Sequence, residues 1–477
     1  MKLHPVDIAK ELKAYSFFQA FPDDLLLQIA TIVETARFSK GSTVLKEGDP
    51  NSSLYFIRTG HAEVLLAGEV VALLQNKGEV IGEMSVVTGR PVSTTIRAAE
   101  DLDCFHIRTE NFAHVPSSEK EHFLHLLYRI YSTILADRLI KTNEKARLFE
   151  IANRELHQAQ MALDKAGPKN VLLVELDKKQ LALAKMALGS TGVQLDTSND
   201  PEEAKRQLNE KAYDAVVADE TCLGLLEHAR EQKYPGRLVM MMTKDVSQNL
   251  AQMQQMGFID YMMTREPEDR HFTIRTILTT LTKVLGKDLF GLEKYLTWGV
   301  DIQSKIVKAS TDREGLREEM AAYFKKMGVR TTILDRVNTV SEELLMNAIY
   351  DAPTDSQGRS LYNHLSRRTE IVLESHLQST LRYASDGVFL AVSVTDPFGS
   401  LTKDIILKYL DRCYQGREEL PEHAGKGGAG RGLHQIVENS DLTVFNVKKG
   451  IKTEVICLFY VEGHRRETQP SFHYFFA

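Results

Sequence analysis

The sequence Glu-Glu-Leu-Leu-Met-Asn-Ala at residues 342–348 is the first of three separated segments near the C-terminus that together decide the fold of this region. The second is Asp-Pro-Phe-Gly at 396–399, and the third is Gly-Gly-Ala-Gly-Arg-Gly-Leu at 427–433. Glu343 and Asn347 are four residues apart, so on a helix they share one face. A carboxylate on that face can accept a proton, and an amide oxygen can ligate Mg²⁺.

The second and third segments supply groups that suit a nucleotide. Asp396 follows a run of alternating apolar residues at 388–394, so its carboxylate is predicted at the end of a strand. There it can accept a hydrogen bond from an amino group such as that of adenine. Gly399 supplies the turn, and the glycine run opens a predicted helix at 433–437, whose bare backbone N–H groups favour phosphates. In this order the three segments predict one ATP site.

These residues resemble the motifs of the GHKL ATPases, the superfamily of histidine kinases, anti-sigma-factor serine kinases, gyrase-type ATPases and Hsp90-type chaperones. The resemblance covers roughly the last third of the chain and implies an α/β sandwich. It implies Glu343 as the general base, Asn347 as the Mg²⁺ ligand and Asp396 as the adenine contact. The other residues that it assigns to ATP are the turn glycine, three lid glycines and a late threonine: Gly399, Gly428, Gly430, Gly432 and Thr453.

Two positions depart from the pattern of that superfamily. Its second motif usually reads Asp-x-Gly-x-Gly, but Asp396 is followed here by Pro-Phe-Gly-Ser, which suits the serine-kinase-like branch better than the histidine kinases. Asp351 stands where the superfamily has a basic residue or histidine. The chain also lacks the His-Glu/Asp-x-x-x-Pro context of the histidine-bearing helix pair. The resemblance therefore favours phosphate transfer to a hydroxyl of a partner protein.

Length, composition and charge exclude several classes of protein. A chain of 477 residues suggests about three domains of some 100–200 residues each. No apolar run approaches the roughly 18–20 residues that span a bilayer, and the N-terminus lacks the apolar core of a signal peptide, so we expect a cytoplasmic protein without a membrane partner. The 4 cysteines are scattered, which argues against a zinc site or a disulfide framework. A net charge of −6 without a basic block argues against nucleic acid as a partner.

Short β-type runs alternate with glycine turns from residue 17 to about 115, which predicts a small β-barrel or jelly roll. Gly-Glu-Met-Ser at 82–85 and Thr-Gly-Arg-Pro at 88–91 resemble the cyclic-nucleotide-binding domains of the cAMP-receptor type. The resemblance implies a pocket with Gly82, in which Glu83 holds the ribose 2′-hydroxyl.

Val92 stands where that family has the arginine that pairs with the cyclic phosphate. A valine cannot neutralise a buried phosphate, and the bidentate contact of an arginine is among the stronger ones in proteins. Ser93 and Thr94 can donate hydrogen bonds to a phosphate, but neutral donors are weaker. The alternatives are a cyclic nucleotide, another ligand, or a β-roll that serves only as a dimer scaffold.

A long helix is predicted between this domain and the next. Residues 119–164 contain neither glycine nor proline, and apolar residues recur there at intervals of three and four, as a two-stranded coiled coil requires. We therefore predict a homodimer through this helix. The polar stretch at 141–145 interrupts the seam. The alternative is a long helix packed on its own domain.

Apolar runs and helix-like segments alternate in the middle of the chain, which predicts a doubly wound sheet. The predicted strands lie at 169–175, 215–219, 238–243 and 257–262, with a helix at 178–188. This region resembles a response-regulator receiver, with Asp219 at the phospho-acceptor position and Thr243 at the switch hydroxyl.

The receiver-like motif is degenerate. The acidic pair that binds Mg²⁺ is reduced to Glu175, because Leu176 fills the second place, and Arg265 precedes Glu266 where the family has lysine before proline. Without a second carboxylate a metal is held poorly, and without the ammonium the developing charge is not offset. Docking and relay are therefore the expected role of this domain.

The sequence thus predicts a multidomain α+β and α/β protein. The predicted parts are a cyclic-nucleotide-binding-like β-roll at 1–115, a dimerisation helix at 116–166, a receiver-like domain at 167–290, a linker at 291–315, a GHKL domain at 316–466 and a tail at 467–477.

The predicted function is signal transduction by an ATP- and Mg²⁺-dependent kinase under the control of the N-terminal domain. Its substrate would be a serine or threonine hydroxyl of a partner protein, of the anti-anti-sigma or response-regulator type. The alternatives are a non-catalytic partner-switching regulator, in which ATP only shifts conformational populations, and a scaffold derived from a histidine kinase.

Overall fold

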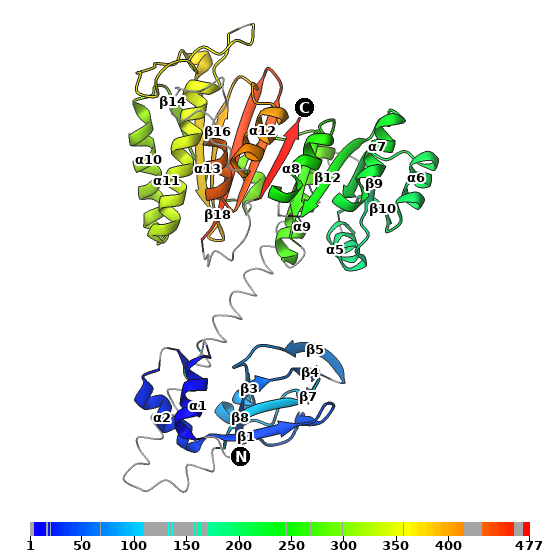
Figure 1. Ribbon diagram of the computed structural model, residues 1–477, viewed down its shortest axis with the longest axis vertical. Coiled ribbons are helices and arrows are strands. Elements are labelled where there is room, and N and C mark those ends of the chain that lie inside the picture. Colours follow the sequence, from blue (N-terminus) through cyan, green and yellow to red (C-terminus); the bar gives the residue numbers. More distant parts are fainter. Residues whose placement is uncertain are drawn as a thin grey trace. The chain divides into compact units, whose positions relative to one another are not determined.

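The computed structural model describes residues 4–15, 18–19, 21–66, 68–108, 169–189, 191–243, 246–266, 269–297, 299–355, 357–414, 432–461 and 471–477, with isolated positions at 132, 136, 157, 161 and 163. The chain divides into two compact units, Met1–Leu148 and Phe149–Ala477 (Figure 1). The connecting helix predicted at 116–166, and with it the homodimer, falls almost wholly outside the described residues.

The first unit is a sandwich of two four-stranded antiparallel sheets, in the orders β1-β8-β3-β6 and β2-β7-β4-β5. The strands are β1 (Glu34–Phe38), β2 (Thr43–Leu45), β3 (Ser53–Thr59), β4 (Ala62–Leu66), β5 (Glu69–Leu74), β6 (Val80–Ile81), β7 (Thr95–Ala98) and β8 (Leu102–Arg108). The helices are α1 (Pro5–Lys13), α2 (Asp23–Ile32) and α3 (Glu83–Thr88).

Two apolar clusters hold this sandwich together. Leu12 and Phe18 from the N-terminal segment pack with Phe56 of β3 and Phe105 of β8. A second cluster includes Ile57 and other side chains of β2, β4, β6, β7 and β8. The alternation of buried and partly buried residues along most of β3 and β7 puts one face of each strand in a core, as a sheet with one buried face requires.

The second unit is built on a single sheet of eleven strands, in the order β10-β9-β11-β12-β13-β19-β17-β18-β16-β15-β14. The strands are β9 (Asn170–Val174), β10 (Gln194–Ser198), β11 (Ala215–Asp219), β12 (Arg237–Thr243), β13 (Tyr261–Arg265), β14 (Gln303–Val307), β15 (Ser379–Ser385), β16 (Phe389–Asp396), β17 (Leu442–Lys448), β18 (Lys452–Tyr460) and β19 (Phe472–Phe476). The strands from β10 to β13 are parallel, whereas those from β17 to β14 are antiparallel.

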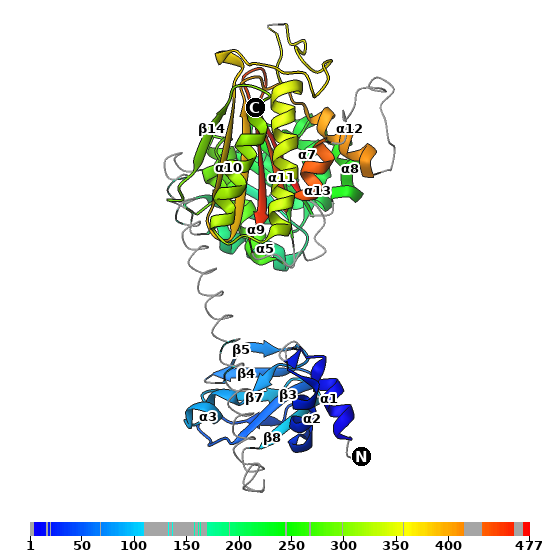
Figure 2. The ribbon, with the colours of Figure 1, turned by 90° about the vertical axis from the view of Figure 1, so that its left-hand side faces the viewer.

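Helices cover both faces of this sheet. They are α5 (Lys178–Leu188), α6 (Pro201–Glu210), α7 (Leu223–Glu231), α8 (Val246–Gln255), α9 (Arg270–Gly286), α10 (Asp312–Lys326), α11 (Thr331–Met346), α12 (Lys403–Tyr414) and α13 (Gly432–Asn439). α5 and α9 share one core cluster, while α6, α7, α8 and α12 contribute to a second. α10 and α11 pack on the antiparallel strands in a third cluster, and Figure 2 turns these two helices toward the viewer.

β19 joins the parallel and antiparallel halves of the sheet. It is antiparallel to β13 and parallel to β17, and Figure 1 shows it as the red arrow between green and orange strands. Its side chains Phe472, Tyr474 and Phe475 are fully buried. The sequence predicted a tail at 467–477, but the structure has a buried strand there, because aromatic side chains fill both faces of the sheet at this position.

The predicted linker at 291–315 also contains structured segments. A 3₁₀ turn spans Leu292–Tyr295, and β14 forms the last strand of the sheet beside β15. Leu292 and Tyr295 are buried in the same cluster as α5 and α9. The segment predicted as a linker is therefore part of the core of the second unit.

A buried polar network crosses the junction between the two halves of the sheet. Lys283 of α9 is fully buried, and its Nζ donates to Asn446 Oδ1 at 2.6 Å and to the Tyr295 hydroxyl at 2.8 Å. Asn446 in turn donates to Glu454 Oε2 at 3.1 Å. Burial lowers the pKa of Lys283 well below its usual value. These contacts tie α9 to the antiparallel strands, so the two halves form one compact unit.

Among the described helices, none combines the length and the hydropathy of a segment that could cross a bilayer. The whole is a multidomain protein of mixed α/β type.

Candidate functional site

The first candidate site lies where the C-terminal end of α11 meets the beginning of α13. Glu343 stands on α11, and Asn347 begins the π-helical turn Asn347–Asp351 that continues it. A Cβ atom added at Gly432, the first residue of α13, would lie 2.5 Å from Glu343 Oε2 and 3.7 Å from Asn347 Oδ1. The structure therefore places one residue of the third segment close to both polar residues of the first.

Asp396 lies at the end of β16, as the sequence predicted, opposite Thr453 of β18. Its Oδ1 accepts a hydrogen bond of 2.9 Å from the amide of Phe398. Burial raises the pKa of Asp396 to about 6, although the backbone amides of Phe398 and Gly399 and the hydroxyl of Thr453 lower it. An acceptor that is buried to this degree suits a ligand that donates a hydrogen bond, such as an amino group.

Gly399 forms the turn after Asp396 with a φ of 61°. A Cβ atom there would lie 2.1 Å from the carbonyl oxygen of Lys448, which is backbone and cannot move aside. The next residue, Ser400, donates from its hydroxyl to the carbonyl of Ala352 at 3.1 Å, just beyond the π-helical turn. This bond holds the turn after Asp396 against the end of the π-helical turn that begins at Asn347. The segments that carry Asp396 and Asn347 therefore lie beside each other.

The surroundings of Glu343 make its carboxylate a stronger base than an exposed glutamate. Burial raises the pKa of its carboxyl, and the neighbouring carboxylates Glu342 and Asp351 raise it further, while Arg367 lowers it. A carboxylate with a raised pKa accepts a proton more readily at neutral pH.

Arg367 is a residue of this region that the sequence analysis missed. Its Nη2 donates to both carboxylate oxygens of Asp351 at 2.7 Å, and its guanidinium lies 5.0 Å from the centre of the Tyr350 ring. Asp351, which stands where a basic residue was expected, is thus neutralised by an arginine 16 residues further along the chain. No periodicity signals such a contact, because Arg367 lies in the irregular stretch between Asp351 and β15.

The donor set of this site fits a magnesium ion that is bound largely through phosphate. The Asn347 amide oxygen is a hard oxygen ligand of the kind that Mg²⁺ prefers. Among the described residues, no group of three or more His, Cys, Asp or Glu side chains could hold a metal by itself. The lid glycines Gly428 and Gly430 fall outside the described residues.

The second candidate site lies in the first unit. Gly82 has a φ of 93° before α3, and a Cβ atom there would lie 2.6 Å from the carbonyl oxygen of Ser53, so a glycine is required. Glu83, at the start of α3, is only 2% exposed. Val92 is also buried, and its backbone exchanges hydrogen bonds of 2.8 and 2.9 Å with Gly48 and Asp49.

The residues beside Val92 offer little compensation for the missing arginine. Ser93 is exposed and Thr94 half-buried, and both are neutral. Arg90 is exposed, and Arg97 is committed to Glu63 at 2.6 Å. A cyclic phosphate bound next to Val92 would therefore meet hydroxyl groups in place of a guanidinium.

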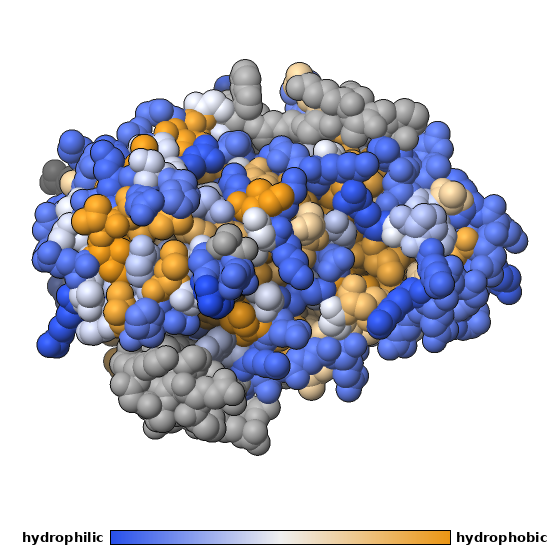
Figure 3. Space-filling model, turned by 90° about the horizontal axis from the view of Figure 1, so that it is seen from above, coloured by the Kyte–Doolittle hydropathy of each residue, from blue (hydrophilic) through white to orange (hydrophobic). Residues whose placement is uncertain are grey.

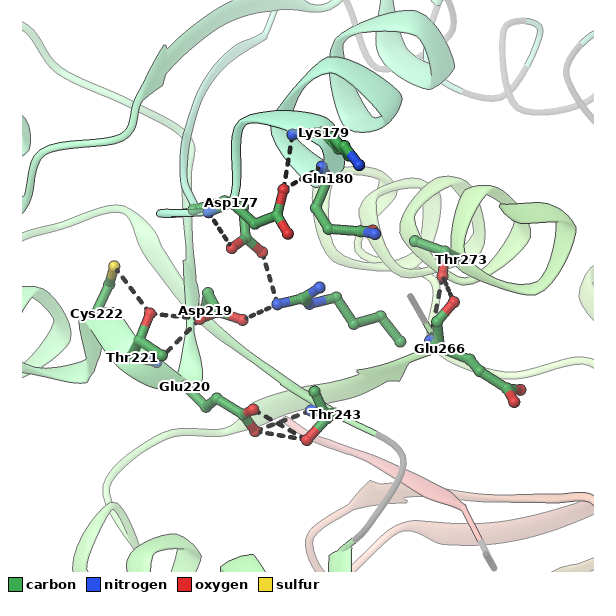
Figure 4. A network of polar contacts seen from close by, with 12 residues as sticks. Asp177, Lys179, Gln180, Asp219, Glu220, Thr221, Cys222, Thr243, Glu266 and Thr273 are labelled. Carbon is green, nitrogen blue, oxygen red and sulfur yellow. Dashed lines mark hydrogen bonds and ion pairs between the residues drawn. The ribbon is translucent and has the colours of Figure 1, made fainter. Parts of the chain in front are cut away.

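The third candidate site surrounds Asp219 at the end of β11 (Figure 4). Asp219 is fully buried, and its Oδ1 accepts from the Thr221 hydroxyl at 2.6 Å. Its Oδ2 accepts from Arg265 Nη2 at 2.6 Å, and the same nitrogen lies 2.8 Å from Glu175 Oε2. Burial raises the pKa of Glu175 to about 7, although Arg265 lowers it. The guanidinium thus occupies the space between the two carboxylates.

Thr243, the predicted switch hydroxyl, donates to Glu220 Oε1 at 2.9 Å, and its backbone amide donates to Glu220 Oε2 at the same distance (Figure 4). The hydroxyl is therefore engaged by the residue after Asp219. The sequence showed Thr-Arg-Glu-Pro at 264–267 where the family has lysine ahead of proline, but the insertion of the Arg265 side chain between Glu175 and Asp219 became evident only from the structure.

Comparisons with known proteins identify the first unit. Residues 35–118 match the family model of the cyclic nucleotide-binding domain. A cAMP-dependent protein kinase regulatory subunit of Colletotrichum orbiculare is 33% identical over 76 residues, which cover 16% of this chain and 19% of that protein. A cGMP-dependent protein kinase of Toxoplasma gondii is 27% identical over 146 residues, 28% of this chain and 14% of that protein.

A solved cyclic nucleotide-binding domain from Methylobacillus flagellatus is 20% identical, with a TM-score of 0.24, and the match covers 31% of this chain and 83% of that chain. The chain spans less than a fifth of the length of the two curated relatives. The first unit thus carries a cyclic nucleotide-binding domain.

Proposed function

We propose that the second unit binds Mg²⁺-ATP beside α11 and transfers a phosphoryl group to a serine or threonine hydroxyl of a partner protein, under the control of the cyclic nucleotide-binding domain. The observation that carries this proposal is that Gly432 lies close to Glu343 and Asn347, which brings two distant segments together at one helix N-terminus. The GHKL-type motifs and the buried acceptor Asp396 support it further.

Each residue of the site has a separate chemical role in this proposal. Asp396 accepts a hydrogen bond from the adenine amino group, and the amides at the start of α13 face the phosphates. Asn347 would hold Mg²⁺, which offsets the charge of the phosphates. Glu343 accepts the proton of the attacking hydroxyl, and the raised pKa of its carboxyl favours this step.

Replacing Glu343 by glutamine tests the catalytic role. Glu343→Gln keeps the size of the side chain and its place beside Gly432, so ATP binding measured by calorimetry should persist. Phosphate transfer to proteins of the native lysate should fall by roughly 10²–10⁴-fold, because the general base is lost. Glu319→Gln removes a carboxylate that pairs with Lys305 on the surface of α10 and serves as the control.

Three outcomes of this experiment separate the hypotheses. Absence of ATP binding by the wild type contradicts the nucleotide site. ATP binding by the wild type without any phosphate transfer favours the non-catalytic partner-switching regulator. Equal transfer by both proteins contradicts the assignment of Glu343 alone.

The matched family indicates which ligand the first unit binds, and Val92 indicates how tightly it binds that ligand. The cyclic nucleotide-binding domain supports a cyclic nucleotide as the regulatory ligand. Because Val92 is buried and uncharged, we expect the wild type to bind cAMP weakly. Val92→Arg should tighten binding, by about tenfold or more if one charge-assisted contact is gained. Calorimetry with cAMP measures the change, with Val92→Leu as the uncharged control. Tight binding of cAMP by the wild type would show that the domain does not need an arginine at position 92.

A further inference from the structure

Glu175 and Asp219 stand where the receiver-like motif of the sequence implies a divalent cation. Glu175 directly follows β9 and Asp219 ends β11, and these strands are parallel neighbours, so both carboxylates lie at the same edge of the sheet. Charged side chains normally lie at the surface, as hydrophilic residues do over much of the face in Figure 3. The side chains of Glu175 and Asp219 are only 3% and 1% exposed. Two carboxylates buried this deeply need a positive partner.

Arg265, the last residue of β13, supplies this positive partner from the chain itself. Its Nη2 lies 2.6 Å from Asp219 Oδ2 and 2.8 Å from Glu175 Oε2, so one nitrogen bridges the two carboxylates. The Arg265 side chain is itself only 7% exposed. A guanidinium stays charged at any ordinary pH, and a side chain cannot diffuse away as an ion can. The positive charge between the two carboxylates is therefore permanent.

The other oxygens of these carboxylates are engaged by hydrogen bonds from nearby residues. Glu175 Oε1 accepts from the amide of Asp177 at 2.9 Å. Asp219 Oδ1 accepts from the amide and the hydroxyl of Thr221 at 3.0 and 2.6 Å (Figure 4). The carboxylate of Asp177 caps the N-terminus of α5. The acidic side chains beside Arg265 are thus already committed to partners within the chain.

Ligand geometry and charge both oppose a divalent cation at this place. Mg²⁺ requires a nearly octahedral set of oxygen ligands, but the guanidinium lies between the two carboxylates that would supply them. Glu220, the acidic residue after Asp219, is engaged by the amide and hydroxyl of Thr243. A divalent ion here would also lie beside the charge of Arg265, and like charges repel strongly where water is excluded. The residues present therefore do not fit Mg²⁺.

We propose that Arg265 is a built-in cation that takes the place of a divalent metal between Glu175 and Asp219. The parallel half of the sheet then reaches its folded arrangement without a metal ion, and a divalent cation binds there only when the guanidinium is removed. Because β13 also pairs with β19, the same side chain fixes the strand on which the antiparallel half is built.

Titration of the full chain with Mn²⁺, followed by the electron paramagnetic resonance of the free ion, tests this inference. The titration contains no nucleotide, so its outcome does not depend on the ATP proposal. The wild type should show no saturable binding. Arg265→Ser removes the guanidinium and leaves both carboxylates, so it should bind Mn²⁺ about tenfold more tightly or better. Adding Asp219→Asn to Arg265→Ser should abolish this gain.

Two further variants separate the charge of Arg265 from a general effect of substitution. Arg237→Ser is the matched control, because Arg237 lies level with Ala215 at the other end of these strands and donates to the Tyr261 hydroxyl at 2.9 Å. It should behave as the wild type does. Arg265→Lys keeps a positive charge near the carboxylates, so it too should show no saturable binding of Mn²⁺.

Urea unfolding covers the case in which Arg265→Ser does not fold by itself. An ion that binds only the folded state stabilises it, so Mn²⁺ should raise the unfolding midpoint of Arg265→Ser or restore its transition. The midpoint of the wild type should stay unchanged. Saturable binding by the wild type that Asp219→Asn removes would overturn the proposal. Failure of Mn²⁺ to bind or stabilise Arg265→Ser would overturn it as well.

Discussion

Removal of residues 471–477 is expected to unfold the second unit. β19 lies in the interior of the eleven-stranded sheet and pairs with β13 on one side and β17 on the other. Truncating one buried aromatic side chain costs about 3–5 kcal/mol, and Phe472, Tyr474 and Phe475 are all lost together. The sum approaches or exceeds the roughly 5–15 kcal/mol by which a domain is stable.

Urea unfolding of the full chain, followed by circular dichroism, measures this effect. The truncated chain should lose the cooperative transition of the second unit while that of the first unit remains. Phe476→Ala is the control, because Phe476 is only partly buried and its loss should lower the unfolding midpoint without abolishing the transition. If the truncated chain unfolds at the wild-type midpoint, β19 contributes little and the two halves of the sheet are independent.

Much of the parallel half of the sheet could be predicted from the sequence. The buried apolar runs at 169–175, 215–219 and 238–243 became β9, β11 and β12, and the predicted helix at 178–188 matches α5. The strand expected at 257–262 begins later, as β13 at Tyr261. A continuous apolar run identifies a strand that is buried on both faces, but it defines the ends poorly.

The continuity of the sheet could not be predicted, because it depends on pairing between distant segments. Phe472 and Thr443 are register partners although β18 and residues 462–470 separate them in the chain. Short aromatic runs near a chain end are compatible with a tail or a strand, and only the neighbours decide. The buried contact of Lys283 with Asn446, 163 residues apart, is equally non-local.

The sequence predicted where the main residues of the candidate ATP site lie on their helix and strand. It did not predict the tertiary contacts between them. Spacing alone predicted that Glu343 and Asn347 share a helical face, and the run before Asp396 predicted its place at the end of a strand. That Gly432 lies close to Glu343 became evident only from the structure. The roles of these residues toward ATP stay predictions, as does the role of Asp219.

Replacing Arg265 by methionine is expected to destabilise the second unit by about 3–5 kcal/mol, the usual cost of removing one partner from a buried ion pair. Glu175 and Asp219 would be left as two buried carboxylates without their shared cation. Arg265→Lys keeps the charge and should cost less. Asp219→Asn should cost less as well, because Arg265 keeps Glu175 as a partner.

The loss of stability in Arg265→Met should depend on pH. The direction of this pH dependence follows from the pKa of the Glu175 carboxyl. The pKa of Glu175 is already raised to about 7 by burial, and loss of Arg265 removes an interaction that lowers it. A carboxyl whose pKa is higher in the folded state stabilises the fold below its unfolded pKa, and this stabilisation is lost as the pH rises through the folded value. The difference in stability between Arg265→Met and the wild type should therefore be larger at pH 8 than at pH 5. Urea midpoints at the two pH values measure it, and a difference that is absent or larger at pH 5 would mean that Arg265 does not neutralise this pair.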